Sequence, residues 1–126
     1  MTPTDAARFD EAWASQIGPA LSERDTARLL ELPLSEVATM ALLRVQNRDG
    51  HWVYPLAQFD GARIATGLAE VLVAFEAAVC SPLTVTAWLT AQRQEFAGRS
   101  YADLLRDGAA DRVATAARRA AATLRH

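Results

Sequence analysis

The sequence predicts a mostly α-helical chain with one small β-hairpin. Apolar residues recur at helical spacings over much of the chain, most clearly between Ile64 and Val79. One strong hairpin signal is present, Asp49-Gly50, because glycine tolerates the positive φ of a tight turn. The chain has 126 residues, of which 51% are apolar, so it is long enough for one compact core.

Residues 1–61 are predicted to form a helix-turn-helix lobe. Ser22 begins a capping-box pattern at the start of the first helix. Pro33 ends that helix, because proline disfavours helical backbone at the residue before it. Ser35 is expected to cap a second helix with the sequence EVATMALL. Two helices joined by a short turn give the helix-turn-helix outline.

The predicted hairpin is expected to be a small two-stranded wing on this lobe. Pro55 should end its strand pairing, because proline has no backbone N–H to donate. We expect the aromatic residues of this region to anchor the wing in the core rather than to stack on nucleic-acid bases. These residues are Trp52, Tyr54 and Phe59.

Residues 62–126 are predicted to form a helical unit. Its first helix carries one apolar stripe, composed of Ile64, Leu68, Val71, Leu72, Phe75 and Val79. Ser81-Pro82 restarts a helix, with serine as the N-cap and proline at the first helical position. The inward-facing residues of this second helix are Val85, Trp88 and Leu89.

A short helix is predicted after Ser100, which forms a capping pattern with Asp103, and Gly108 ends it. Neighbouring helical residues point about 100° apart. We therefore expect one of Leu104 and Leu105 to enter the core while the other lies near the surface; the alternative is that both close the core. A last helix follows from about Asp111, with one face made by Val113, Ala117, Ala120 and Leu124.

The composition argues against several classes of function. The net charge is −2, and six of the thirteen arginines lie in Arg99–His126 against three aspartates, so only the end of the chain is basic. Cys80 is the only cysteine, which excludes an internal disulfide and a cysteine-based metal site. Neither a signal-peptide pattern nor a membrane-spanning apolar run is found, and we expect a cytoplasmic protein.

Catalytic motifs are also missing from the sequence. The two histidines, His51 and His126, are not placed at ligand or triad spacings. No glycine-rich phosphate loop and no paired-carboxylate motif is found. We expect a protein that is not an enzyme and that needs no cofactor or metal.

DNA is the weaker of two expected partners. The predicted second helix, Ser35–Leu43, carries no Arg, Lys, Asn or Gln to reach base edges, and its only charge, Glu36, repels phosphates. Arg44, Arg48 and His51 can contact a DNA backbone, which gives weak, salt-sensitive binding. A lobe that packs or dimerises is therefore favoured over one that reads sequence.

The segment that begins at Ser81 resembles the toxin-binding domain of Xre/MbcA/ParS-type antitoxins, and the segment before it, from Gly50 to Phe75, resembles the winged N-terminal half found in one branch of those proteins. Together the resemblance covers roughly Leu29 to Leu124. The features that carry it are Trp88-Leu89 on a helix, Gly98-Arg99-Ser100 after a loop, Ala102-Asp103-Leu104-Leu105, Asp107-Gly108, and Val113 on a terminal helix. The resemblance implies an antitoxin for a RES-domain toxin, an enzyme that degrades NAD⁺. In that family the C-terminal helical segment lies over the toxin's NAD-binding cleft.

This resemblance directs the predicted partner site to the end of the chain. We expect Tyr101 and the short helix to dock on the toxin, and the last turn to close the cleft sterically. The expected toxin-binding residues are Arg99, Tyr101, Leu105, Arg106, Leu124, Arg125 and His126. A homodimer is also expected, because two apolar stripes are more than so small a body easily hides. The alternatives are a stand-alone winged-helix DNA-binding transcriptional regulator and an orphan scaffold.

Overall fold

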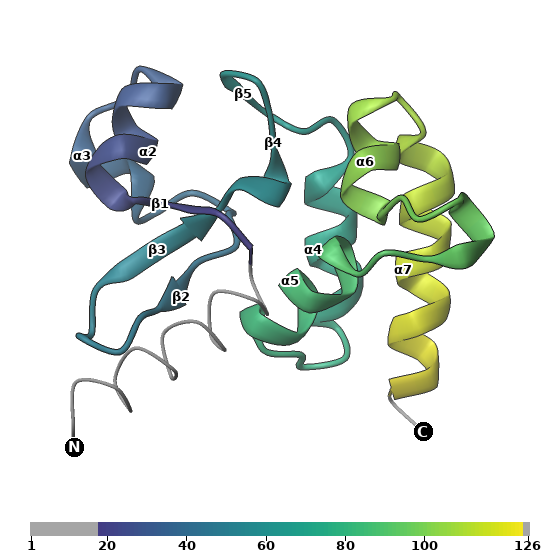
Figure 1. Cartoon of the computed structure of the whole chain (residues 1–126). Helices are drawn as coiled ribbons and strands as arrows, with labels where there is room; N and C mark the ends of the chain where they lie inside the picture. Colours follow the sequence, from purple (N-terminus) through teal and green to yellow (C-terminus); the bar gives the residue numbers. More distant parts are fainter. Residues whose placement is uncertain (1–17, 125–126) are drawn as a thin grey trace, which may run out of the picture.

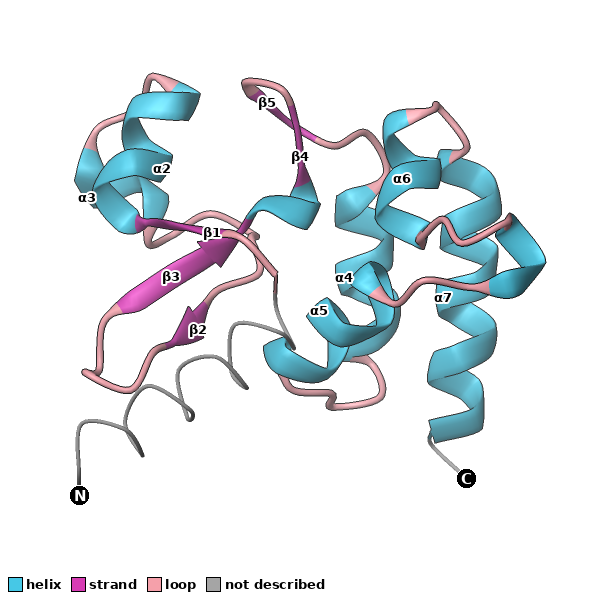
Figure 2. Ribbon diagram, viewed as in Figure 1, coloured by secondary structure: helices cyan, strands magenta, loops and turns pink. Residues whose placement is uncertain are grey.

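Helices predominate in the structure, a computed structural model that describes residues 18–124, and small antiparallel sheets complete it. The three-stranded sheet lies with α2 and α3 on one side, and the later helices, α4 to α7, lie on the other (Figures 1 and 2). The first group consists of β1 (Ala20–Ser22), α2 (Glu23–Leu30), α3 (Leu34–Val37), β2 (Val45–Gln46) and β3 (Trp52–Pro55).

β1, β3 and β2 form a three-stranded antiparallel sheet in that order. Ala20 pairs with Pro55, and Val45 pairs with Val53. The hairpin lies where it was predicted, but the sheet has a third strand, and Pro55 is a paired residue rather than the end of pairing. In the connecting loop, the Asn47 side-chain oxygen accepts the backbone N–H groups of Asp49 and His51 at 3.0 and 2.9 Å.

The predicted cap of α2 is confirmed, whereas that of α3 is wrong. The Ser22 side chain accepts the Asp25 backbone N–H at 3.0 Å. The N-cap of α3 is Pro33, not Ser35, and the helix ends at Val37. The predicted extension toward Leu43 is absent, and buried Gln58 holds both backbone groups of Leu43. Its Oε1 accepts the Leu43 N–H at 2.7 Å, and its Nε2 donates to the Leu43 carbonyl at 2.8 Å.

A second, two-stranded sheet leads from this region to the helices. The 3-10 helix η1 (Leu56–Gln58) comes first. The sheet itself consists of β4 (Phe59–Asp60) and β5 (Arg63–Ile64), and α4 (Leu68–Glu76) follows it. Ile64 therefore belongs to a strand and not to the predicted helix. The N-cap of α4 is Gly67, with φ at +96°, and an added Cβ there would lie 2.7 Å from the Ala110 Cβ. Glycine at this position thus permits a close approach of two elements.

Val79 is the second residue that departs from the predicted stripe. It follows α4 with φ at +56° and is 91% exposed. The Val79 N–H still donates to the Glu76 carbonyl and that of Cys80 to the Phe75 carbonyl, so the chain turns sharply at the helix end. The other stripe members in α4 are at least partly buried and belong to the core.

The remaining helical elements are α5 (Pro82–Thr90), η2 (Gln94–Phe96), α6 (Tyr101–Arg106) and α7 (Ala110–Leu124). Ser81 caps α5 with proline at its first position, as predicted. The capping box of Ser100 and Asp103 is also present, and Gly108 follows the end of α6 with φ at +87°. α7 packs along α4, side by side in Figure 1.

Two apolar clusters form the core. The smaller contains Ala27, Val37, Tyr54 and Phe59, and the larger is built mainly from α4, α5, α6 and α7. The half-buried side chains of Leu42 and Ile64 pack against both clusters. The predicted division of the chain after residue 61 stays a prediction.

Candidate functional site

Arg44 is held over an exposed aromatic ring at the hairpin. Its guanidinium carbon lies 4.1 Å from the centre of the Trp52 ring. Trp52 is 37% exposed, so the expectation that it anchors the core is wrong, whereas Tyr54 and Phe59 are buried as predicted. Trp52 and Tyr54 are two residues apart and therefore share one face of β3, but Trp52 is the first residue of the strand, next to the hairpin turn, and burial increases from there toward Pro55. Stacking on Trp52 restricts the position of Arg44.

The hairpin is also connected to α2 through Tyr54. The Tyr54 hydroxyl donates to Glu23 Oε1 at 3.5 Å. Burial raises the pKa of Tyr54 above its usual value, the Glu23 carboxylate adds to this rise, and the hydrogen bond from Arg44 opposes it. The Tyr54 hydroxyl therefore stays neutral and donates to Glu23, which holds β3 against the start of α2. Arg44 lies next to the same hydroxyl.

One surface groove joins the start of α2, the start of α3 and the hairpin. His51 and Trp52 come from the hairpin, and Leu34, itself 49% exposed, comes from α3. The residues that line this groove, called here the hairpin groove, are Ser22, Glu23, Arg24, Leu34, Asn47, Gly50, His51, Trp52 and Val53. Of the three residues predicted to contact DNA, His51 lies in the groove, Arg44 packs on its Trp52, and Arg48 belongs to the same loop.

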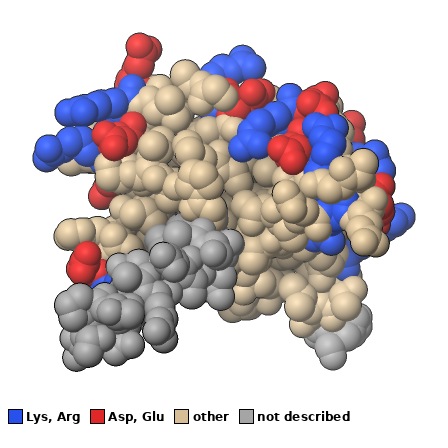
Figure 3. Space-filling model, in the orientation of Figure 1, with Lys and Arg blue, Asp and Glu red and all other residues tan. Residues whose placement is uncertain are grey.

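Charges of both signs are mixed on the surface. Figure 3 shows arginines and carboxylates interspersed over the α2 and α3 side and over the α6 and α7 side, with few charges on the middle of that face. Around the hairpin groove, Arg24 is opposed by Glu23. This surface therefore attracts a polyanion only through individually placed cations, not through a strong overall field.

The residues predicted to bind a toxin do not form one surface. Arg99 forms an ion pair with Asp107, and its side chain is 45% exposed. Tyr101 is half-buried and stacks on Trp88 with ring centres 4.2 Å apart. Leu105 is 2% exposed and Leu104 7%, so both close the core and Leu105 offers no surface to a partner. The two leucines reach the same core because α6 is covered on more than one side, by α5 and by α7.

Arg106 is committed to contacts inside the chain. Its Nε donates to the Phe59 carbonyl at 3.0 Å, and a terminal nitrogen donates to the Leu56 carbonyl at 3.2 Å. Its other terminal nitrogen lies 3.3 Å from an Asp103 oxygen. The side chain is still 36% exposed, so the prediction that Arg106 contacts a partner stays a prediction. Of the predicted last turn, Leu124 is 56% exposed, and Arg125 and His126 lie outside the described residues.

A second groove lies where α7 passes the segment before α6. Phe96 stands with its ring 5.2 Å from that of Tyr101, and the guanidinium of Arg112 lies 4.9 Å from the Phe96 ring centre. This groove, called here the α7 groove, is lined by Glu95, Phe96, Tyr101, Asp111, Arg112, Thr115, Ala116 and Arg119. Phe96, in η2, and Arg112, on α7, were not predicted as site residues, because no motif or spacing relates residues on two separate elements.

Residues 18–124 were searched for groups of metal ligands and for membrane-spanning helices. No three His, Cys, Asp or Glu side chains in this range are grouped as metal ligands would be. No helix in the same range is long and apolar enough to cross a membrane.

Comparison with known proteins identifies a similar fold but no family. No protein-family model matches the chain, and no curated protein matches its sequence. The NMR structure of Rv2175c is similar to it, with a TM-score of 0.72 and 20% sequence identity. The match covers 82% of this chain and 81% of that chain, so the likeness extends over both of the regions described above.

Proposed function

We propose that residues 20–55 form a winged helix-turn-helix and that the protein binds double-stranded DNA through it. The observation that carries the proposal is the order of elements. α2 and α3 are joined by a short turn, and the β2–β3 hairpin follows. The second strand of that hairpin pairs with β1, which precedes the helices. In a helix-turn-helix the second helix enters the major groove, and the hairpin then lies against the neighbouring backbone.

The hairpin groove supports this proposal because it places the three expected contact regions on one surface. Arg24 stands at the start of α2, Leu34 begins α3, and His51 belongs to the hairpin. Arg44 adds a guanidinium that is already ordered by Trp52, so less conformational entropy is lost when it contacts a phosphate. Phosphate contacts of this kind position a protein on DNA without reading its sequence.

The chemistry of α3 sets the expected strength of binding. Its exposed polar residues are Ser35 and Glu36; a hydroxyl contacts several bases equally well, and a carboxylate repels phosphates. We therefore expect micromolar, weakly selective binding by the free protein. With about three phosphate contacts, the affinity should fall roughly 40-fold between about 50 and 200 mM salt.

Fluorescence anisotropy with a labelled duplex from the protein's own upstream region tests this. Arg48→Ala should weaken binding severalfold and reduce the salt slope by about one. Arg119→Ala removes the same charge from α7, far along the chain from the hairpin, and should leave both quantities unchanged. Equal weakening by the two variants, or no binding at low salt, would contradict the proposal.

The second candidate function is the antitoxin that the resemblance implies. It is favoured by the α7 groove, where Tyr101, Phe96 and two arginines gather, since aromatic residues and arginine dominate protein–protein contacts. Exposed Leu124 extends the apolar surface at the end of α7. In this case the partner would be a RES-domain toxin, docked at Arg99 and Tyr101 and blocked sterically by the last turn.

Co-expression with an adjacent reading frame that encodes a RES-domain protein, followed by pull-down, tests the second candidate. Arg112→Glu should reduce recovery of the toxin, whereas Arg48→Glu at the hairpin should not. Deletion of Thr123–His126 should leave the complex intact but weaken protection against NAD⁺ loss, because the plugging turn is gone. A complex that forms and protects equally well with both changes would exclude the α7 groove and the tail as the docking site.

A further inference from the structure

An exposed apolar face runs along α4. Ala69, Val73 and Ala77 follow each other at intervals of four residues, so they lie on one side of the helix. All three are exposed, and Val73 exposes 65% of its surface. The other valine and the leucines of α4 pack in the core, whereas Val73 points into solvent. Its exposed side chain marks a face that an interaction can cover.

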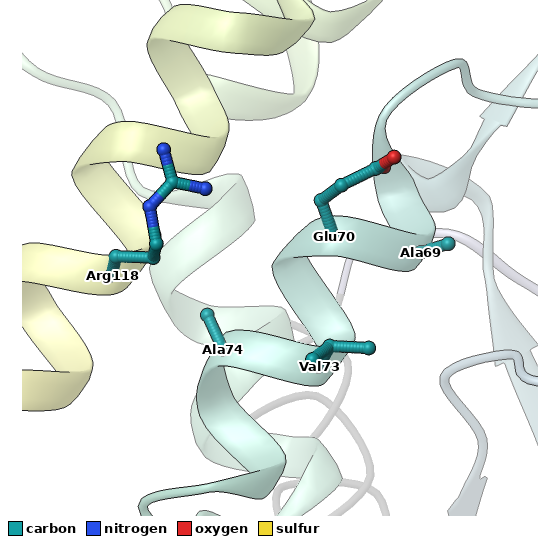
Figure 4. A pocket seen from close by; sticks show the side chains of 5 residues that line it. All are labelled: Ala69, Glu70, Val73, Ala74 and Arg118. Atoms are coloured by element: carbon teal, nitrogen blue, oxygen red, sulfur yellow. The ribbon is translucent and has the colours of Figure 1, made fainter.

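A groove beside this face carries two opposite charges. Ala69, Val73 and Ala74 form its apolar part, and the charged ends of Glu70 from α4 and Arg118 from α7 stand on opposite sides (Figure 4). Arg118 donates to the Thr115 hydroxyl at 3.2 Å, one turn earlier on its own helix. Among the described residues Glu70 forms no ion pair, so its carboxylate is available to a cation from outside.

This charge pattern is self-complementary. A twofold axis places the same patch of two copies face to face. A residue away from the axis then meets a different residue of the other copy, whereas a residue on the axis meets its own counterpart. If the axis passes near Val73, Glu70 of each copy faces Arg118 of the other, and the two valines meet in the middle. The same surface thus offers both the apolar centre and the charged rim that protein interfaces have.

We propose that a second copy of this chain docks on the groove between α4 and α7, with Val73 at the centre and two symmetric Glu70–Arg118 pairs at its edges. The proposal rests on the fold and not on the proposed function, because the groove between α4 and α7 shares no lining residue with the hairpin groove or the α7 groove. Two other exposed apolar side chains lie near the ends of these helices, since Val79 follows α4 and Leu124 is the last residue of α7. The two helix ends lie at the same end of the molecule in Figure 1.

Charge reversal gives a sharp test by analytical ultracentrifugation of the full chain. Glu70→Arg and Arg118→Glu each create two like-charge pairs, so each should weaken dimerisation by at least about tenfold. A mixture of the two single variants should recover the dimer, because every reversed residue then faces an opposite charge. The double variant should recover it as well. Arg119→Glu, one residue further on the same helix, is the matched control and should have no effect.

Val73→Ala supplies an independent measurement, since it reduces the apolar centre without changing charge, and it should also weaken the dimer. Thermal unfolding checks that each variant is folded. A wild-type chain that stays monomeric at high micromolar concentration overturns the proposal. A dimer that both reversals leave intact also overturns the proposal, because the dimer then forms through another surface. Single variants that stay monomeric when mixed overturn it as well, because Glu70 and Arg118 then do not face each other across the interface.

Discussion

Arg106 on α6 donates from Nε to the backbone carbonyl of Phe59, 47 residues earlier in the chain, at 3.0 Å. A second bond from the same guanidinium reaches Leu56. The side chain thus joins the helical half to the segment that follows the hairpin. A guanidinium offers five donors in a fixed plane, so it can satisfy two carbonyls and a carboxylate at once. Arg106 holds the two regions of the chain together.

Arg106→Ala should therefore destabilise the protein. Hydrogen bonds from charged donors stabilise more than neutral ones, and we expect a loss of about 1–2 kcal/mol in the free energy of unfolding. Urea unfolding measures it. Arg99→Ala is the matched control, because it removes an arginine whose ion pair with Asp107 is largely exposed, and it should cost under about 1 kcal/mol. Equal losses would mean that the contacts to Phe59 and Leu56 contribute nothing.

Gly67→Ala should be more damaging than Gly98→Ala. Both glycines have positive φ, +96° and +85°, so both substitutions strain the backbone. Only at Gly67 does the new Cβ also meet another element, the Ala110 Cβ at 2.7 Å, while around Gly98 nothing lies within 4 Å. We expect Gly67→Ala to cost roughly 1–3 kcal/mol more than Gly98→Ala. Melting temperatures of the two variants decide this, and a similar decrease in both would argue against close packing of α4 and α7.

Val79→Gly should stabilise the chain. A β-branched residue at φ +56° is strained, and Val79 buries almost none of its side chain in return. Relief of this strain should raise the free energy of unfolding by about 1 kcal/mol. Ala97→Gly, at φ +57°, is a useful comparison because alanine has no branch at Cβ, so its gain should be smaller. A loss of stability in Val79→Gly would contradict this view of the turn.

The capping box at Ser100 should make part of the stability pH-dependent. The backbone N–H of Ser100 lowers the pKa of Asp103 below its usual value, and the Ser100 hydroxyl and the arginines nearby add to this effect. A folded-state pKa below the unfolded one contributes stability that is present above about pH 4 and lost as pH falls through the lowered value. Asp103→Ala should cost about 1 kcal/mol at pH 7, and its difference from wild type should shrink in acid. A difference independent of pH would show that the carboxylate charge is not involved.

Local features of the fold could be predicted from the sequence because they depend on neighbouring residues. The caps at Ser22, Ser81 and Ser100 and the helix end at Gly108 are determined within a few positions of each other. The hairpin around Gly50 is of the same kind.

Features that depend on distant partners were missed or predicted wrongly. β1 has only three residues and no apolar alternation of its own; it is a strand because β3 lies beside it. The backbone of Leu43, predicted to be helical, is held instead by Gln58, fifteen residues further along the chain.

The candidate sites show the same limit. Arg44 and His51 were found from residue type, since guanidinium and imidazole N–H groups next to a turn can donate to phosphates. The burial of Leu105 and the internal contacts of Arg106 could not be found, because the residues that cover or bind them lie on other elements. The Phe96–Arg112 contact was missed for the same reason.

Contact between DNA and the lobe of α2, α3 and the hairpin can be mapped residue by residue with NMR. The backbone amide signals of the ¹⁵N-labelled full chain are followed while an unlabelled duplex is added at low salt. We expect shifts that cluster at Ser22–Arg24, Leu34–Thr39 and Val45–Trp52, and little change in α4, α5 and α7. Shifts concentrated around Glu95–Arg119, or none at all, would contradict it.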